Sequence, residues 1–217
     1  MVTPIPAPRS GHKGTSGVGT VVRLPVPETD VALAACLRTD PERGQEALFD
    51  RYAGDVERIL YRILGPDPEI TDLLHEVFIV AITSIDSLRD ATRLRSWLAG
   101  VAVHQARRLI RRRRIRRLVQ FVAPARLPDH QSILPSVEAS QALRETYRIL
   151  EQLPADDRIA FTLRQIDGME LSAIAQATQV SLATVKRRVS RAQRTFVAMA
   201  SANETLVEWL ARGTLER

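Results

Sequence analysis

Residues 170–194, ELSAIAQATQVSLATVKRRVSRAQR, predict a helix-turn-helix that ends in a basic second helix. Ile174 and Ala175 close the inner face of the first helix, and the small Ala175 lets the second helix cross closely. Residues 179–181 supply the turn. Ser181 is a good N-cap, because its hydroxyl accepts hydrogen bonds from the free backbone N–H groups of the following turn. The stretch therefore predicts two short helices packed across each other.

The second helix of this motif has an apolar side and a basic side. Val185 and Val189 are four residues apart and are expected to point inward. The outward positions carry side chains of types that contact DNA, namely Thr184, Lys186, Arg187, Arg188 and Arg191. Such a helix presents its N-terminal side chains to base edges in the major groove and its basic side chains to phosphates. The pattern favours binding to duplex DNA over the alternative, a helical hairpin with a solvated basic face.

Composition narrows the class of protein. The chain has 217 residues and is 45% hydrophobic, which is enough for a core, but it is only 5% aromatic. Leu, Ile, Val and Ala must therefore build the core. The net charge of +6 favours a polyanionic partner, nucleic acid first. Arginine far outnumbers lysine, and a GC-rich genome explains this bias better than the bidentate contacts of arginine do.

Cysteine, histidine and apolar runs argue against several other classes. A single cysteine, Cys36, excludes an intramolecular disulfide and is interpreted as a small core residue. The four histidines are scattered without metal-ligand spacing, so no metal or other cofactor is expected. No run reaches the roughly 18 apolar residues of a membrane span. The N-terminus lacks the apolar segment of a secretory signal. These observations predict a cytoplasmic protein without membrane insertion.

Helical periodicity divides the chain into two small all-α domains. Prolines and glycines fill residues 1–27, which are expected to form a disordered tail. Helical patterns cover residues 28–118, where Asp40-Pro41 predicts the capped start of a helix, residues 86–95 a polar loop and Trp97 the start of the next helix. Three prolines within 119–137 predict an extended linker. A second helical domain follows over 138–201 and contains the helix-turn-helix. The tail at 202–217 has a short apolar stripe of Leu206, Trp209 and Leu210, interpreted as a capping helix rather than as a contact for a regulator.

An arginine run ends the first helical domain. Residues 107–117 hold eight arginines. Arginines on every side of a helix cannot be buried, so this segment is expected to contact solvent or phosphate. One or two arginines would suffice to complement the helix dipole, whereas eight repel one another without a polyanion. The run favours a nucleic acid partner, and an arginine-rich RNA-binding helix remains an alternative to a DNA-binding one.

In this order and spacing, these parts resemble the bacterial extracytoplasmic-function (ECF) sigma factors over about residues 44–200. The string DLLHEVF at 72–78 is similar to the family's polymerase-docking helix. The string SWL at 96–98, followed by the arginine run, is similar to its promoter −10 helix. The string LEQLP at 150–154 and the helix-turn-helix resemble its fourth domain, which binds the −35 element.

The resemblance implies an alternative sigma factor that binds core RNA polymerase and promoter DNA. Such a protein stabilises melted DNA while the polymerase does the chemistry, is expected to be a monomer when free, and has an anti-sigma partner. Asp72 and Glu76, with Leu73 beside them, would form the docking face, since positions i and i+4 share one side of a helix. Ordinary surface acids fit that spacing equally well. A stand-alone helix-turn-helix regulator remains the alternative function.

The resemblance also implies two sets of DNA-contacting residues. The −10 set is Arg93, Arg95, Trp97, His104, Arg107, Arg108, Arg111 and Arg112. The −35 set is Ser181, Thr184, Lys186, Arg187, Arg188 and Arg191. Trp97 would either stack on a base or pack in the core, and the core is favoured. The arginines would hold the opened strand electrostatically.

Several residues depart from the family's pattern. Gln179 stands in the turn where glycine is usual, and a left-handed conformation there would cost about 1 kcal/mol. Thr178 replaces an apolar residue, which predicts a less tightly packed hairpin. His104 and Arg108 stand where Asn and Asp are common, so the family's promoter preference does not carry over.

Overall fold

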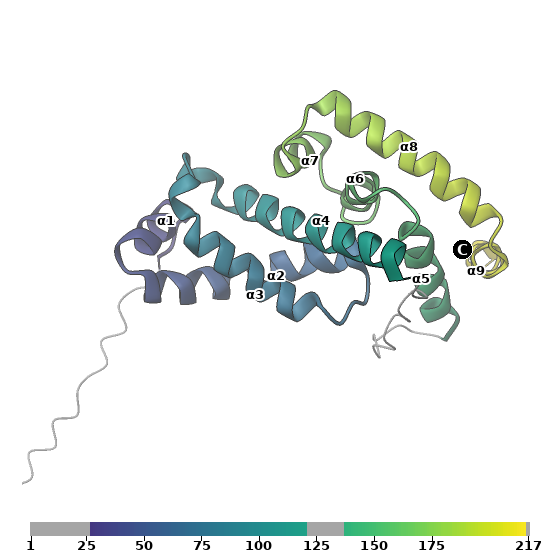
Figure 1. The fold of residues 1–217 in the computed structure, drawn as a ribbon, viewed down its shortest axis with the longest axis horizontal. Helices are drawn as coiled ribbons and strands as arrows, with labels where there is room; N and C mark the ends of the chain where they lie inside the picture. Colours follow the sequence, from purple (N-terminus) through teal and green to yellow (C-terminus); the bar gives the residue numbers. More distant parts are fainter. Residues whose placement is uncertain (1–26, 121–136, 216–217) are drawn as a thin grey trace, which may run out of the picture.

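The computed structural model describes residues 27–120 and 137–215, and every regular element in these ranges is a helix (Figure 1). The all-α class predicted from periodicity is confirmed. The expected tail and linker fall almost entirely on residues 1–26 and 121–136, which lie outside the described residues. Within the described ranges, no helix is both long enough and apolar enough to cross a bilayer.

The N-terminal half consists of α1 (Asp30–Thr39), α2 (Pro41–Leu64), α3 (Ile70–Thr83) and α4 (Leu94–Gln120). Asp40 caps α2 as expected, because its side chain accepts from the backbone N–H of Arg43 and Pro41 occupies the first helical position. The segment expected to be a polar loop contains two 3-10 turns, η1 (Ile85–Ser87) and η2 (Ala91–Arg93). Since η2 runs directly into α4, that helix starts three residues before the expected Trp97.

The C-terminal half consists of α5 (Val137–Leu150), α6 (Ala155–Gln165), α7 (Leu171–Thr178), α8 (Leu182–Ser201) and α9 (Glu204–Leu215). The turn between α7 and α8 has the predicted chemistry. Gln179 adopts the left-handed conformation at φ 56°. The Ser181 hydroxyl accepts from the Thr184 backbone N–H at 3.2 Å. Thr178 is buried, but its hydroxyl donates to the Ile174 carbonyl at 2.6 Å, so its polar group is satisfied.

Two smaller expectations have mixed outcomes. On α9, Leu206 is buried with Ala142 and Ile149 of α5, which fits a capping helix. Trp209, expected on the same apolar stripe, is 44% exposed. Cys36 is partly exposed rather than a core residue.

The two halves pack against each other. Helix α7 lies on α4, and α6 contacts both α2 and α4. Ile159 and Ile174 therefore join one buried cluster with Leu98 of the other half. At the closest crossing, Gly100 faces Ala177, and a Cβ at position 100 would lie 3.4 Å from the Ala177 carbonyl oxygen. We call this packing of α6 and α7 on α2 and α4 the closed arrangement.

Candidate nucleic-acid interface

Helix α3 has the acidic face that the spacing predicts. Asp72 and Glu76 are both exposed. Leu73, predicted with them as a polymerase-binding residue, is only 5% exposed and packs in the core beneath this face. Ile79, three residues beyond Glu76, is 60% exposed and adds an apolar side chain to the same face. The exposure of Ile79 could not be predicted from the sequence, because an isoleucine at this position of an apolar helix is equally consistent with the core.

The start of α4 places four of the predicted −10 residues near the surface. Arg95 donates to Asp55 at 2.9 Å, and Arg93 pairs with its neighbour Asp90 at 3.3 Å. Trp97 is partly buried against the main core, as favoured from the sequence. Its remaining surface and the exposed His104 line a groove of about 340 Å³ between α4 and α7.

The arginine run of α4 is largely engaged by carboxylates of the same chain. Arg107 and Arg111 both pair with Asp156 of α6, at 2.8 and 3.2 Å, and the side chain of Arg107 is only 18% exposed. Arg112 pairs with Glu69 at 2.6 Å. Most of the described part of this run is exposed, as expected, but several of its arginines are already paired with carboxylates of the chain. Acidic residues distant in the sequence supply the counter-charge.

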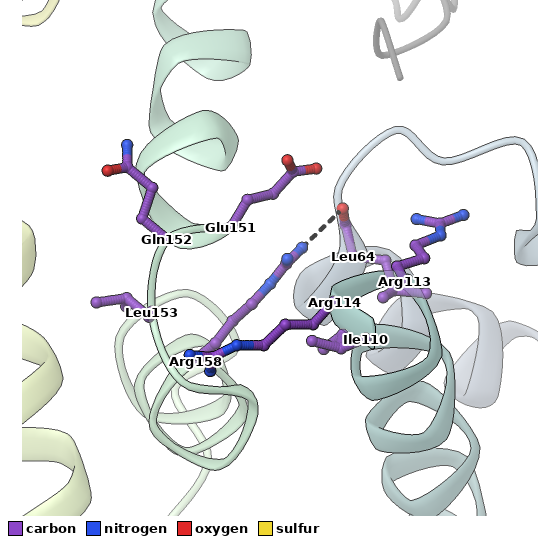
Figure 2. A pocket seen from close by; sticks show the side chains of 8 residues that line it. All are labelled: Leu64, Ile110, Arg113, Arg114, Glu151, Gln152, Leu153 and Arg158. Atoms are coloured by element: carbon purple, nitrogen blue, oxygen red, sulfur yellow. Dashed lines mark hydrogen bonds between the residues drawn. The ribbon is translucent and has the colours of Figure 1, made fainter. Parts of the chain in front are cut away.

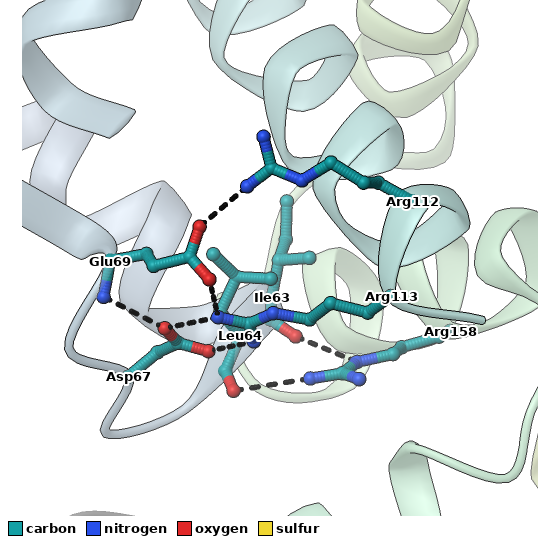
Figure 3. Close-up of polar contacts among 7 residues, drawn as sticks. All are labelled: Ile63, Leu64, Asp67, Glu69, Arg112, Arg113 and Arg158. Atoms are coloured by element: carbon teal, nitrogen blue, oxygen red, sulfur yellow. Dashed lines mark hydrogen bonds and ion pairs between the residues drawn. The ribbon is translucent and has the colours of Figure 1, made fainter. Parts of the chain in front are cut away.

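Arg113 is a partly buried member of the run that has two carboxylate partners. It donates to both carboxylate oxygens of the buried Asp67 and, at 2.7 Å, to Glu69 (Figure 3). Burial alone would raise the pKa of Asp67. The hydrogen bonds from Arg113 and from the backbone N–H of Glu69 outweigh that effect and hold the pKa of Asp67 below its usual value. Arg113 thus ties the loop before α3 to α4 and is a structural residue.

Helix α8 has both free and engaged basic residues. Lys186 and Arg187 are exposed and form no ion pair with any residue in the described ranges. Arg188 was expected to point outward, but its side chain is only 17% exposed and pairs with Asp156 at 3.2 Å. Arg191 makes a bidentate contact with the buried Asp157, at 2.5 and 2.6 Å. Lys186 and Arg187 are therefore more available to a partner than Arg188 and Arg191.

Asp156 is the functional residue that sequence reasoning missed. Its carboxylate contacts Arg107 and Arg111 of α4 as well as Arg188 of α8, so it joins the two predicted DNA-binding helices. Acidic residues in the first turn of a helix are common because they complement its dipole. Because this ordinary explanation accounts for Asp156, the surrounding sequence gives no sign of its contact with the arginines.

In the described ranges, no group of His, Cys, Asp or Glu is arranged to hold a metal ion.

Comparison with known proteins places these helices in one family. The Sigma-70 region 2 model matches residues 48–116, and the Sigma-70 region 4 model matches residues 143–195. The ECF RNA polymerase sigma-E factor of Escherichia coli K12 is 26% identical over 185 residues, covering 76% of this chain and 91% of that protein. The sigma-E factor of Haemophilus influenzae is 26% identical, with coverages of 76% and 92%.

The chain belongs to the ECF sigma factors. As an alternative sigma factor it directs promoter-specific transcription, and its family consists of non-enzymatic initiation factors. The match to region 2 as well as region 4 disfavours a stand-alone helix-turn-helix regulator.

Two solved structures share the fold of this sigma factor. CnrH in complex with the cytosolic domain of CnrY has a TM-score of 0.57 at 23% identity, covering 81% of this chain and 99% of that one. The sigma factor RpoE in complex with the anti-sigma factor NepR from Bartonella quintana has a TM-score of 0.56 at 19% identity, with coverages of 73% and 98%.

Proposed function

We propose that this ECF sigma factor binds core RNA polymerase through α3 and contacts the promoter with α4 and α8. The observation that carries the proposal is the order of the two family matches, each of which includes one arginine-rich helix. The −10 element falls to α4 and the −35 element to α8. The polymerase does the chemistry, and the sigma factor supplies promoter binding and holds the opened strand. It therefore acts in the cytoplasm, where the polymerase works.

The docking face on α3 combines two acidic side chains with an exposed apolar one. Asp72 and Glu76 are exposed one turn apart, and Ile79 lies on the same side. An exposed isoleucine beside acidic residues suits a protein partner better than a nucleic acid, because carboxylates repel phosphates. This face is assigned to core RNA polymerase.

The −35 contact rests on the first half of α8. Ser181 caps the helix, while Lys186 and Arg187 extend into solvent. Thr184 is partly exposed, and its hydroxyl oxygen is hydrogen-bonded to that of Ser181 at 2.9 Å. A helix entering the major groove contacts base edges with exactly such N-terminal side chains. Arg187 is the strongest candidate for a base contact, whereas Arg188 and Arg191 require rearrangement of their carboxylate partners.

The −10 contact rests on α4. A groove of about 470 Å³ between α3 and α4 is lined by Arg108, Arg112 and Glu76 among others. Arg93, Arg95 and His104 lie exposed nearer the start of α4, with Trp97 partly exposed beside them. Trp97 lines the other groove, between α4 and α7. Basic side chains and an aromatic ring on one helix suit a single strand, whose phosphates and unstacked bases need both. Arg111 already lines the groove between α3 and α4, and Arg107 becomes available once it leaves Asp156.

An anti-sigma protein is the second proposed protein partner. Both structural neighbours were solved as complexes, CnrH with CnrY and RpoE with the anti-sigma factor NepR. We infer that a protein of the same class holds this chain inactive, and that the chain is a monomer when no partner is bound.

Run-off transcription tests the proposed function. The purified chain and core RNA polymerase without any other sigma factor should initiate at specific promoters of the source genome. The double variant Asp72→Ala, Glu76→Ala should bind core polymerase more weakly in a pull-down than the control Glu57→Ala, an exposed acid on α2. Absence of any specific transcript, with binding to a palindromic site as a dimer, would instead support a stand-alone regulator.

A further inference from the structure

The C-terminal end of α2 receives its hydrogen bonds from the other half of the chain. The last four carbonyls of an α-helix have no partner within the helix. In α2 these belong to residues 61–64. The Tyr147 hydroxyl donates to the carbonyls of Tyr61 and Arg62 at 3.2 and 3.1 Å. Arg158 donates to those of Ile63 and Leu64 at 2.9 and 3.1 Å (Figures 2 and 3). The Tyr61 carbonyl also accepts from the backbone N–H of Gly65 at 2.8 Å, so it is the carbonyls of residues 62–64 that depend on α5 and α6.

Gly65 provides the space for this contact. It ends α2 at φ +79°, and the Tyr147 ring lies directly against its backbone. A Cβ at position 65 would lie 2.6 Å from two atoms of that ring, closer than side chains can approach. Tyr147 is 2% exposed. Burial raises the pKa of its hydroxyl to about 12, so it remains a donor at physiological pH.

Arg158 makes this contact reversible. It is 4% exposed, and its hydrogen bonds go to helix carbonyls rather than to carboxylates. The negative end of the α2 dipole offsets only part of the cost of removing a guanidinium from water. Burial accordingly lowers the pKa of Arg158 to about 10, yet the group stays charged at neutral pH. The guanidinium regains hydration when the halves separate, which lowers the cost of opening.

The closed arrangement covers one side of the −10 helix. Helices α6 and α7 lie along α4, where Gly100 meets Ala177. On that side Arg107 and Arg111 are paired with Asp156, as is Arg188 of α8. The side chain of Arg107 is only 18% exposed, so a DNA strand cannot reach it in place of the carboxylate until α6 moves away, whereas that of Arg111 is 61% exposed and stays accessible.

We propose that Tyr147 and Arg158 form a latch that caps α2, holds the free sigma factor closed, and so keeps Arg107 from DNA. The inference rests on the proposed function, because it assumes that α4 contacts the promoter. Opening exchanges the Asp156 contacts for phosphate contacts. The latch therefore makes binding of single-stranded promoter DNA depend on a partner that separates the two halves.

Two glycines offer a matched test of the latch. Gly65→Ala pushes a Cβ into the Tyr147 ring, whereas Gly168→Ala places one in open space at a similar φ of +75°. Both variants place an alanine at a positive φ, but only Gly65→Ala forces a Cβ against the Tyr147 ring. Tyr147→Phe, which removes only the capping hydroxyl, is paired with Tyr52→Phe, which removes a hydroxyl bonded to Asp30 within the N-terminal half.

The measurements use the full chain without polymerase. Small-angle X-ray scattering gives the radius of gyration, and fluorescence anisotropy gives affinity for a labelled mixed-sequence single-stranded DNA of about 20 nucleotides. Gly65→Ala should expand the chain and tighten DNA binding on the order of tenfold, and Tyr147→Phe about fivefold. Gly168→Ala and Tyr52→Phe should leave both quantities unchanged.

The latch is refuted if Gly65→Ala and Tyr147→Phe keep their helical circular dichroism and match the wild type in both measurements. It is also refuted if either control shifts them as much. Should Gly65→Ala lose its helical signal, Tyr147→Phe decides, because it removes one oxygen atom only. Run-off transcription by the wild type with core polymerase is scored separately, so failure of the proposed function is distinguished from failure of the latch.

Discussion

The arginine run of α4 and the basic first half of α8 have similar charge but different availability. In α4, Arg107, Arg111 and Arg113 are held by carboxylates from other elements. In α8, Lys186 and Arg187 extend into solvent without an ion pair in the described ranges. The difference shows that a cationic helix is not by itself a binding surface. What decides availability is whether the fold brings a carboxylate to it.

The largest expected effect concerns the arginines of α4 that are paired with carboxylates. Arg113→Met leaves the buried Asp67 without its guanidinium partner, so the free energy of unfolding should fall by about 3 kcal/mol. Urea denaturation measures the change. Arg116→Met, an exposed arginine three residues further along, should stay within about 0.5 kcal/mol of the wild type. Equal losses in the two variants would contradict the structural role of Arg113.

The same pair of variants should differ in acid. The folded-state pKa of Asp67 is below its usual value of 3.8, so this carboxylate stabilises the fold above that pH, and the stabilisation is lost as pH falls through the folded pKa. Without Arg113, burial remains and raises the pKa of Asp67. Acid unfolding of Arg113→Met, followed by circular dichroism, should therefore begin at higher pH than that of the wild type or of Arg116→Met.

The next largest effect compares two neighbouring arginines of α8. Arg187→Ala should weaken binding of the free chain to promoter duplex about tenfold at unchanged stability, because it removes an available contact. Arg188→Ala should cost less than half as much in binding energy, since Arg188 is paired with Asp156. Fluorescence anisotropy on a −35 duplex measures both. Equal losses would show that pairing with Asp156 does not limit Arg188.

Release of the paired arginines should have a smaller effect on DNA affinity, and it should raise that affinity rather than lower it. Asp156→Asn removes the carboxylate shared by Arg107, Arg111 and Arg188. Affinity for single-stranded DNA should rise about fivefold in low salt, with a steeper dependence on salt concentration. Glu57→Gln removes the same charge from an exposed site and should change affinity far less. An unchanged salt slope for Asp156→Asn would contradict the release of arginines.

The smallest effect concerns the turn that precedes α8. Gln179→Gly relieves a left-handed conformation at φ 56° and should raise the free energy of unfolding by about 0.5 kcal/mol. Thermal unfolding measures the gain. Gln176→Gly, within α7, should instead destabilise the chain by about 0.8 kcal/mol. If both substitutions stabilise the chain, relief of backbone strain at position 179 is not the reason that Gln179→Gly stabilises it.

Local features of the fold were predictable because their causes are local. Asp40 followed by Pro41 starts α2, and Ser181 starts α8, since caps act on the next few backbone N–H groups. The inward positions of Val185 and Val189 follow from helical spacing. The start of α4 was misplaced because η2, a single 3-10 turn, has no distinct periodicity.

The packing between halves was not predictable, because no local pattern specifies which distant surfaces meet. Gly100 and Ala177 look like ordinary small helical residues until α7 is placed on α4. Asp156 looks like a normal first-turn acid, and Arg158 like a solvated arginine. Their partners are more than 30 residues away in the sequence, which is why the sequence-based assignment counted Arg107, Arg111 and Arg188 as free.

The most direct test follows the distance between the two halves when polymerase binds. In a Cys36→Ser background, cysteines replacing the exposed residues Glu57 on α2 and Val197 on α8 carry a donor and an acceptor dye. We predict that energy transfer falls when core RNA polymerase is added, in step with the appearance of specific run-off transcripts. Unchanged transfer in a holoenzyme that transcribes would contradict the account, because the closed arrangement would then itself be active.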